Sequence, residues 1–178
     1  MSVTIRHAVA ADSPLIAALS MQVWLDTYAI DGINSAIAGF VFSSFTDAEQ
    51  LARLNDPTQQ RIVAERDGNL LGVLTLHRDA LCPCDPALRH ELDAVYVSRH
   101  AQRQGIGARL LARAAEMARR DGAKALWLTV WHRNARALAF YDALGWQRIG
   151  ETDFVIDGTP HRNIVFRFDL QRPAEHAS

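Results

Sequence analysis

Two glycines, Gly105 and Gly107, lie between a predicted strand at residues 92–97 and a predicted helix at residues 107–120. A strand that leads directly into a helix indicates a mixed α/β protein. The first N–H groups of a helix have no partners within the helix and lie at the positive end of its dipole, so this junction suits an anion. Glycine keeps Cβ atoms out of the path of a phosphate, although a tight turn with positive φ also selects glycine. Three arginines surround the junction: Arg99, Arg103 and Arg109.

The other segments predict one mixed α/β domain over residues 1–172, followed by a frayed tail at residues 173–178. A chain of 178 residues has the usual size of one domain. The turn Asp67-Gly68-Asn69 between two apolar runs predicts a hairpin. Residues 30–54 are less regular and predict one helix and a mobile loop. The predicted helices begin at Ser13, Gly107 and Asn134, and the predicted strands are residues 3–7, 61–65, 70–77, 92–97, 125–130, 146–151 and 164–170.

Charge and cysteine content argue against several kinds of protein. Nineteen Lys and Arg against twenty Asp and Glu give a net charge of -1, which does not suit a nucleic-acid binder. No apolar run approaches the roughly 18 residues of a membrane span, so we expect a soluble, cytoplasmic protein without a membrane partner. Cys82 and Cys84 are too close for a stabilising disulfide, and we expect free thiols near solvent. Their spacing from His77, Asp85 and His90 matches no standard zinc pattern, so no metal is predicted.

The glycine junction matches neither of two common phosphate-binding motifs. The dinucleotide fingerprint requires a small residue where Leu110 stands, and the P-loop requires Lys and then Ser or Thr after Gly107. The remaining pattern is Gln-x-x-Gly-x-Gly at residues 102–107. It resembles the acyl-CoA pyrophosphate loop of the Gcn5-related N-acetyltransferases, the GNAT superfamily. Residues 134–146 resemble this family's downstream signature, in which an Asn opens a helix that contains Phe-Tyr and ends in Leu-Gly-aromatic.

The resemblance covers residues 63–170 and implies a fold and a co-substrate. The implied fold is a mixed, mostly antiparallel sheet that splays between two central parallel strands and is flanked by helices. The implied co-substrate is acetyl-CoA, whose pantetheine arm binds the main chain of the central strand and whose pyrophosphate binds the glycine loop. The residues that match these positions are Val95, Val97, Gln102, Arg103, Gln104, Gly105, Ile106, Gly107, Ala108, Asn134 and Tyr141.

The resemblance also implies roles for three side chains in acetyl transfer. Tyr141 matches the tyrosine that donates a proton to the departing CoA thiolate, a role that suits a phenol. Glu91 lies at the start of the central strand, where some members carry the general base, and Asp93 or water could serve instead. With a period of two, residues 91, 93, 95 and 97 share one side of the strand. Asn134 is also a favoured helix N-cap, and both roles are compatible.

The N-terminal half matches the family only in general plan, as an acceptor-binding half usually does. Trp24 and Tyr28 resemble a recurring wall of the acceptor pocket, although aromatic residues at helical spacing more often form core. Residues 150–158 have a loop-like sequence that resembles the polyamine-acetylating branch. The acidic residues Asp26, Asp31, Glu91 and Asp93 favour a cationic acceptor.

The sequence therefore predicts an acetyl-CoA-dependent N-acetyltransferase that acts by direct attack of a primary amine in a ternary complex. No cysteine lies near the proposed chemistry, which argues against a covalent enzyme intermediate. The acceptor stays open between a polyamine, a peptide amine and a small amine, and homodimer formation stays open too. The alternative is a non-catalytic module that binds acyl-CoA in a regulatory role, because a fold does not by itself imply activity.

Overall fold

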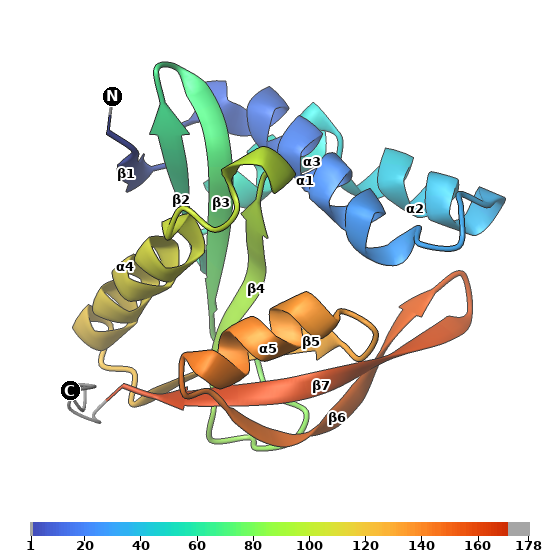
Figure 1. Ribbon diagram of the computed structural model, residues 1–178. Helices are drawn as coiled ribbons and strands as arrows, with labels where there is room; N and C mark the ends of the chain where they lie inside the picture. The colour runs from blue at the N-terminus through green and yellow to red at the C-terminus, as the bar shows by residue number, and fades with distance from the viewer. Residues whose placement is uncertain (1, 171–178) are drawn as a thin grey trace.

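A seven-stranded sheet in the order β1-β2-β3-β4-β5-β7-β6 runs through the computed structural model of the chain (Figure 1). The structure describes residues 2–170, so the predicted tail at residues 173–178 lies outside the described residues. All neighbouring strands are antiparallel except β4 and β5, which are parallel. This arrangement confirms the predicted fold class. The strands are β1 (Thr4–His7), β2 (Gln59–Arg66), β3 (Asn69–Arg78), β4 (His90–Val97), β5 (Ala125–Trp131), β6 (Gln147–Ile156) and β7 (Thr159–Asp169).

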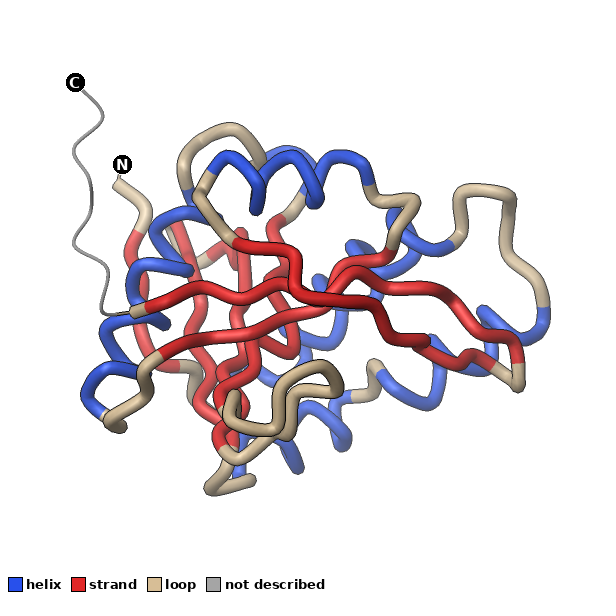
Figure 2. Tube along the Cα trace, turned by 90° about the horizontal axis from the view of Figure 1, so that it is seen from below, coloured by secondary structure: helices blue, strands red, loops and turns tan. Residues whose placement is uncertain are grey.

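Helices cover both faces of the sheet (Figure 2). On one face, Ile16 of α1 lies in a buried cluster with Val63 and Val73. On the other face, Leu110 of α4 lies in the largest buried cluster together with Leu74. No helix within residues 2–170 is both long enough and apolar enough to cross a membrane. The helices are α1 (Ser13–Tyr28), α2 (Ser35–Ser44), α3 (Asp47–Asn55), α4 (Ile106–Arg120) and α5 (Ala135–Ala143), with short 3-10 turns at Ala10–Asp12 and Arg99–Ala101.

The segment at residues 30–54 contains two helices, α2 and α3, where the sequence predicts one helix and a mobile loop. Each helix begins at a capping side chain, because Asn34 accepts the Ile37 N–H at 2.9 Å and Thr46 accepts the Glu49 N–H at 3.1 Å. The prediction missed α2 because its sequence is apolar on all sides and therefore shows no helical period.

Residues 150–158 are not a loop, which corrects the sequence prediction. They form the end of β6 and the tight turn to β7, and Asp157 and Gly158 both have positive φ values, of 47° and 75°. Phe154 and Ile156 pack into a cluster with Trp24, so the hairpin end lies against the N-terminal helices. The likeness of this sequence to the polyamine-acetylating branch stays a prediction.

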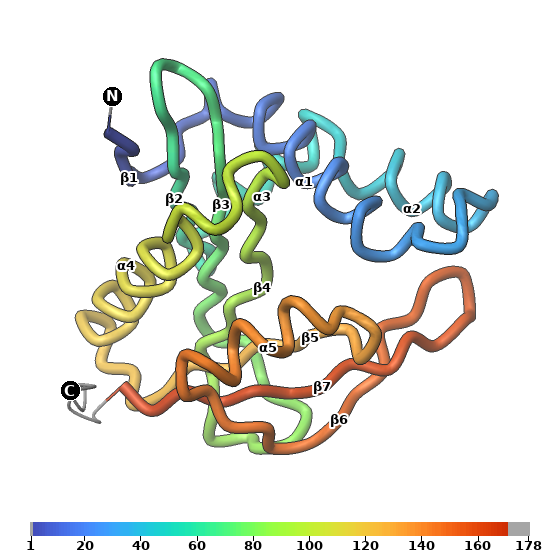
Figure 3. Tube along the Cα trace, viewed as in Figure 1, coloured from blue at the N-terminus to red at the C-terminus, as the bar shows by residue number. Residues whose placement is uncertain are grey.

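Strands β4 and β5 pair at a single position, Glu91 with Trp127, and then separate. Figure 3 shows β4 rising along the molecule, whereas β5 runs off behind α5. Each strand keeps its outer neighbour, since β4 pairs with β3 and β5 pairs with β7 along their lengths. The separation is the splay that the sequence predicts, and it leaves main-chain groups of both strands without a ladder partner.

A β-bulge at Asp93 changes which side chains of β4 share a face. The pairing with β3 passes directly from Ala94 to Leu92, so Asp93 is the extra residue. Leu92 and Val95 are three positions apart, yet both pack with the buried cluster on the α4 face. The strict alternation predicted for residues 91–97 is therefore wrong, because the bulge shifts it by one residue.

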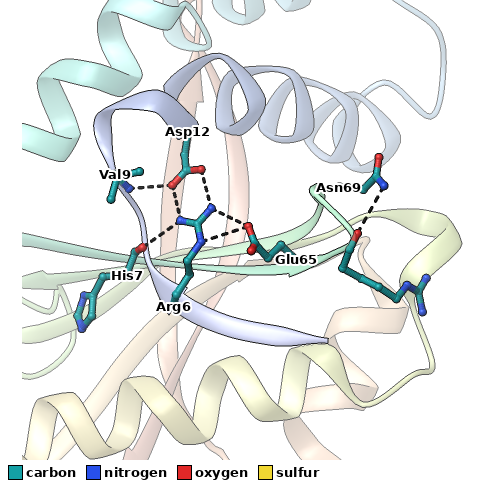
Figure 4. A network of polar contacts seen from close by, with 7 residues as sticks. Arg6, His7, Val9, Asp12, Glu65 and Asn69 are labelled. Atoms are coloured by element: carbon teal, nitrogen blue, oxygen red, sulfur yellow. Dashed lines mark hydrogen bonds and ion pairs between the residues drawn. The ribbon is translucent and has the colours of Figure 1, made fainter. Parts of the chain in front are cut away.

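A partly buried ion pair fixes the start of α1 on the sheet (Figure 4). The guanidinium of Arg6 on β1 donates to both carboxylate oxygens of Asp12, at 2.6 and 2.9 Å, and to Glu65 of β2 at 2.6 Å. Asp12 also accepts the Val9 N–H at 2.8 Å. Asp12 directly precedes α1, so these bonds hold the N-terminus of that helix against β1 and β2. The orientation of α1 matters because its opposite end reaches the cleft described below.

We expect Asp12→Asn to lower the free energy of unfolding at pH 7 by about 2–3 kcal/mol, because Arg6 loses its buried charge partner. Arg6 holds the pKa of Asp12 below its usual range. The stabilisation is therefore present above the ordinary carboxyl pKa of about 3.9 and is lost as the pH falls through the lowered pKa. Urea unfolding of both proteins at pH 7 and pH 3 measures this, and an equal difference at both values would contradict it. The control Asp142→Asn, which breaks an exposed pair with Arg148, should cost less than about 1 kcal/mol.

Candidate active site

A cavity of about 990 Å³ lies between the separating strands β4 and β5 and extends to α1, α3 and the start of α4. Its size suits a small-molecule ligand. Gln104 is the one predicted site residue that does not line it, because its amide instead donates to the His100 carbonyl at 3.1 Å. The predicted residues that do line it are Trp24, Tyr28, Glu91, Asp93, Val95, Val97, Gln102, Arg103, Gly105, Ile106, Gly107, Ala108, Asn134 and Tyr141.

The glycine loop presents a row of free main-chain donors to this cavity. None of the backbone N–H groups from Gln102 to Ala108 donates a hydrogen bond to another residue in the range 2–170. The first backward bond of α4 comes from Arg109, whose N–H donates to the Gly105 carbonyl at 3.1 Å. Free N–H groups at the N-terminus of a 15-residue helix carry partial positive charge and suit an anion.

The geometry of the protein itself explains both glycines of the loop. Gly105 has a φ of +73°, and a Cβ there would meet no atom within 4 Å. Glycine is therefore needed for the backbone conformation and not for space. At Gly107 a Cβ would lie 3.3 Å from Cζ of Phe140, so glycine allows α4 and α5 to approach each other closely. The free N–H groups, rather than the glycines alone, make this loop suited to an anion.

Gln102 and Asn134 hold the loop and α5 in place. The Gln102 side-chain amide donates to the Val97 carbonyl at 3.2 Å and accepts a bond from Arg136, which links the loop to both β4 and α5. Asn134 is the N-cap of α5, and its Oδ1 accepts the Ala137 N–H at 3.1 Å. Its side-chain N–H groups make no hydrogen bond within the described residues, so they remain available to a ligand in the cavity.

Tyr141 on α5 is 6% exposed and packs against Trp146 and Phe166, with ring centroids 5.4 and 5.8 Å away. Its hydroxyl makes no hydrogen bond to any residue that the structure describes, and the side chain lines the cavity. Burial raises the pKa of Tyr141, so the phenol stays protonated at neutral pH. It is thus a hydrogen-bond donor without a partner in the protein.

Glu91 is an acid with a strongly shifted pKa at the point where β4 and β5 part. Burial, with a smaller contribution from the nearby charge of Asp93, raises the pKa of Glu91 to about 8. Asp93 is already paired, since Arg53 of α3 donates to its carboxylate at 3.2 Å. The pKa of Glu91 therefore lies near neutral pH.

Aromatic side chains form the wall of the cavity beside α1 and α2. Trp24 is 3% exposed and stacks between Tyr28 and Phe40, with centroids 4.7 and 4.6 Å away. Tyr28 also stacks on Trp131 of β5, at 5.1 Å, so the wall connects the two halves of the molecule. Trp24 thus belongs to a buried cluster, and Tyr28 is the more accessible of the two predicted wall residues.

Comparison with known proteins identifies the family. The sequence pattern of the acetyltransferase (GNAT) family matches residues 24–146. The chain belongs to the GNAT acetyltransferase family. It is 30% identical over 164 residues to a probable N-acetyltransferase of Mycobacterium tuberculosis, covering 88% of this chain and 82% of that protein. It is 28% identical over 147 residues to an uncharacterized N-acetyltransferase of Lactobacillus delbrueckii subsp. lactis, covering 82% and 84%.

Solved structures show the same GNAT fold. The PaiA N-acetyltransferase of Thermoplasma acidophilum, in complex with coenzyme A, superposes with a TM-score of 0.74 at 20% identity, over 95% of this chain and 99% of that one. A putative acetyltransferase, YncA of Salmonella typhimurium, with its cofactor acetyl-CoA, gives 0.65 at 22% identity, over 100% and 98%. These similarities confirm the predicted fold.

The GNAT cleft also contains polar side chains that sequence analysis missed, namely Gln50 and Arg53 of α3 and Arg61 of β2. Arg61 stands at the first position of a predicted strand, where a charged residue ordinarily meets solvent, and no local pattern shows that α3 covers it. The sequence predicts only one helix in residues 30–54 and does not place α3 against β2, so all three were overlooked.

The cysteine loop differs in part from the sequence prediction. Cys84 is exposed, as expected, but Cys82 is 4% exposed and packs with Leu88, Trp127 and Val165. The prediction of two thiols near solvent is therefore wrong for Cys82, because the loop folds over β5. Within residues 2–170, no three His, Cys, Asp or Glu side chains are grouped to hold a metal ion.

We expect Glu91→Gln to stabilise the protein increasingly as the pH rises. Below about pH 4.5 the carboxyl is protonated in both the folded and the unfolded chain, so it contributes no pH dependence. Between that value and a folded pKa of about 8, the unfolded chain releases a proton that the folded protein retains, which disfavours folding. Chemical unfolding at pH 5 and pH 8 should show the advantage of the Gln variant growing by an amount on the order of a few kcal/mol. An advantage that does not change with pH would mean that Glu91 ionises normally.

Proposed function

We propose that the protein is an N-acetyltransferase that moves the acetyl group of acetyl-CoA to a primary amine by direct attack in a ternary complex. The observation that carries this proposal is the row of free N–H groups at residues 102–108, directly beside the open edge of β4. A ligand with a pyrophosphate and a long amide-containing arm has groups for both features. The neighbouring structures with coenzyme A or acetyl-CoA bound support the same ligand.

Different residues of the cleft suit the pyrophosphate and the pantetheine arm of acetyl-CoA. The loop N–H groups, with Arg103 and Arg136 at the cavity wall, would bind the pyrophosphate. The main chain at Val95 and Val97 would bind the pantetheine arm as an added strand, because β5 has moved away from this edge. The free amide of Asn134 is available to the same arm. The thioester would then lie near Tyr141, at the inner part of the cleft.

In the proposed reaction, the lone pair of the amine attacks the thioester carbonyl carbon, and the C–S bond then breaks. An ammonium has no lone pair, so a base must first take a proton, and Glu91 fits because its pKa is close to neutral pH. Tyr141 would donate its hydroxyl hydrogen bond to the departing thiolate. Neither Cys82 nor Cys84 lines the cavity, which supports direct transfer without an acyl-cysteine.

A non-catalytic module that binds acyl-CoA is the alternative function. The two functions separate in one experiment: the purified protein is incubated with acetyl-CoA and a panel of primary amines, and free CoA thiol and acetylated amine are measured. An enzyme releases both products in equal amounts. Binding of acetyl-CoA without amine-dependent thiol release would favour the regulatory module.

We expect Gly105→Val to abolish acetyl-CoA binding, because the new side chain occupies the face on which the pyrophosphate would lie. At 100 times its Kd, acetyl-CoA should stabilise the parent by about 2.7 kcal/mol, seen as a higher melting temperature. Gly122→Val is a matched control at the other end of α4, because Gly122 also has a positive φ, of +79°, and open space around it. Both variants should lose similar intrinsic stability, but the control should keep the ligand-induced shift. A normal shift in Gly105→Val would disprove the loop's role.

We expect Tyr141→Phe to lower kcat by at least about tenfold while melting temperature and acetyl-CoA affinity stay near those of the parent. The substitution keeps the buried ring and removes only the unpartnered hydroxyl, and a positioned proton donor typically supplies about 10²–10⁴-fold in rate. The loss should be smaller with an acetyl thioester whose thiol is more acidic, because that leaving group needs less help. Turnover equal to the parent would exclude the donor role, and a lower melting temperature would indicate a structural hydroxyl.

A further inference from the structure

Arg61 is a buried cation in the part of the cleft between α1, α3 and β4. It is 6% exposed and lines the cavity. Its Nε donates to the Thr75 hydroxyl at 2.9 Å and its Nη1 donates to the Gln50 amide oxygen at 2.9 Å. Both acceptors are neutral, Nη2 makes no hydrogen bond, and no carboxylate within residues 2–170 lies at ion-pair distance. A buried charge without a counter-charge is unfavourable, so this position suits an anionic ligand group.

A second unpartnered polar group lines the same cavity. Ser20 of α1 is 1% exposed, and its hydroxyl has no hydrogen-bond partner. Buried hydroxyl groups are normally satisfied, so this one indicates a missing partner. A hydroxyl and a guanidinium nitrogen that both lack acceptors call for the same kind of ligand atom, an oxygen that carries negative charge.

The nearby acids do not neutralise Arg61. Asp93 and Glu49 both pair with Arg53, at 3.2 and 3.3 Å, so neither carboxylate is an ion-pair partner of Arg61. Glu91 has a pKa of about 8 and is mostly uncharged at pH 7. None of the ion pairs formed by these acids therefore includes the Arg61 guanidinium.

We propose that the acceptor is a primary amine that also carries a carboxylate, which binds Arg61 and the Ser20 hydroxyl while the amine faces Glu91. This substrate class deepens the proposed acetyl transfer and rests on it. Aromatic side chains also line this cavity, among them Trp24, Phe40 and Phe45. The acceptor class is therefore an amino acid with an apolar or aromatic side chain.

The test compares three amino acids with the amines that lack only their carboxylates. L-Phenylalanine, L-leucine and L-methionine are paired with 2-phenylethylamine, 3-methylbutylamine and 3-(methylthio)propylamine, with acetyl-CoA as donor. The amino acid of at least one pair should have a kcat/KM at least about 30-fold higher than its amine, the usual scale for losing one partner of a buried charged contact. 3-Phenylpropanoate, which has the carboxylate but no amine, should raise the melting temperature of the CoA complex and compete with the amino acid.

Three variants connect the preference to Arg61. Arg61→Met should reduce the ratio of the two kcat/KM values, amino acid over amine, to within about threefold. 3-Phenylpropanoate should no longer raise the melting temperature of the CoA complex or compete with the amino acid. Arg61→Lys keeps the charge without the planar donor fork, so it should retain part of the ratio. Arg78→Met removes an arginine of the same sheet that does not line the cavity, and it should leave the ratio unchanged. Calorimetry of acetyl-CoA binding checks that each variant is folded. If Arg61→Met does not fold, the partial loss of the kcat/KM ratio in Arg61→Lys is the test instead.

The outcomes separate this inference from the proposed function. If the amines are bound and acetylated as well as the amino acids, the carboxylate site is wrong although acetyl transfer stands. If neither the amino acids nor 3-phenylpropanoate bind to a parent protein that binds CoA, the inference is also overturned. If they bind through Arg61 but no thiol is released, the carboxylate site stands and acetyl transfer fails.

Discussion

The separation of β4 from β5 after one shared pair is the constraint from which the rest of this structure follows. A strand edge inside a protein needs partners for its N–H and C=O groups, and the neighbouring strand no longer supplies them. The opening between the strands becomes the cavity, and the loop that leaves β4 brings the N-terminus of α4 to its side. Main-chain donors from a strand and from a helix therefore meet in one place. A ligand with an amide-rich arm and an anionic group at one end satisfies both.

Contacts of β4 and β5 with other elements hold the two strands apart at a fixed position. On one side, β3 holds β4 along its length, and on the other, β7 holds β5. The stack of Tyr28 on Trp131 joins the two halves across the gap, at a centroid distance of 5.1 Å. The ion pair of Arg6 with Asp12 fixes the beginning of α1, and Tyr28 stands at the end of the same helix. A contact at the far edge of the sheet thus sets where the aromatic wall of the cleft lies.

Sequence analysis predicted the features that depend on local chemistry. The Gln-x-x-Gly-x-Gly loop, the Asp-Gly turn of β2 and β3 and the Asn134 cap are encoded within a few residues each, and periodicity found the helix after the loop. It missed features that depend on distant segments. The bulge at Asp93 depends on pairing with β3, and α2 lacks an amphipathic period. The unpaired charge of Arg61 exists only because α3 covers it, so no single stretch of sequence shows it.

Burial favours opposite roles for the two proposed proton-transfer groups of the cleft, Glu91 as proton acceptor and Tyr141 as hydrogen-bond donor. Desolvation disfavours the charged form of any acid, so it raises the pKa values of Glu91 and Tyr141 together. For Glu91 the higher pKa makes the carboxylate a stronger base, close to the strength needed to take a proton from an ammonium near neutral pH. For Tyr141 it keeps the phenol protonated and able to donate a hydrogen bond. The same loss of water would therefore prepare an acceptor of protons at the start of β4 and a donor on α5, and it also leaves Arg61 in need of a counter-charge. A substrate that brings its own carboxylate would supply that negative charge.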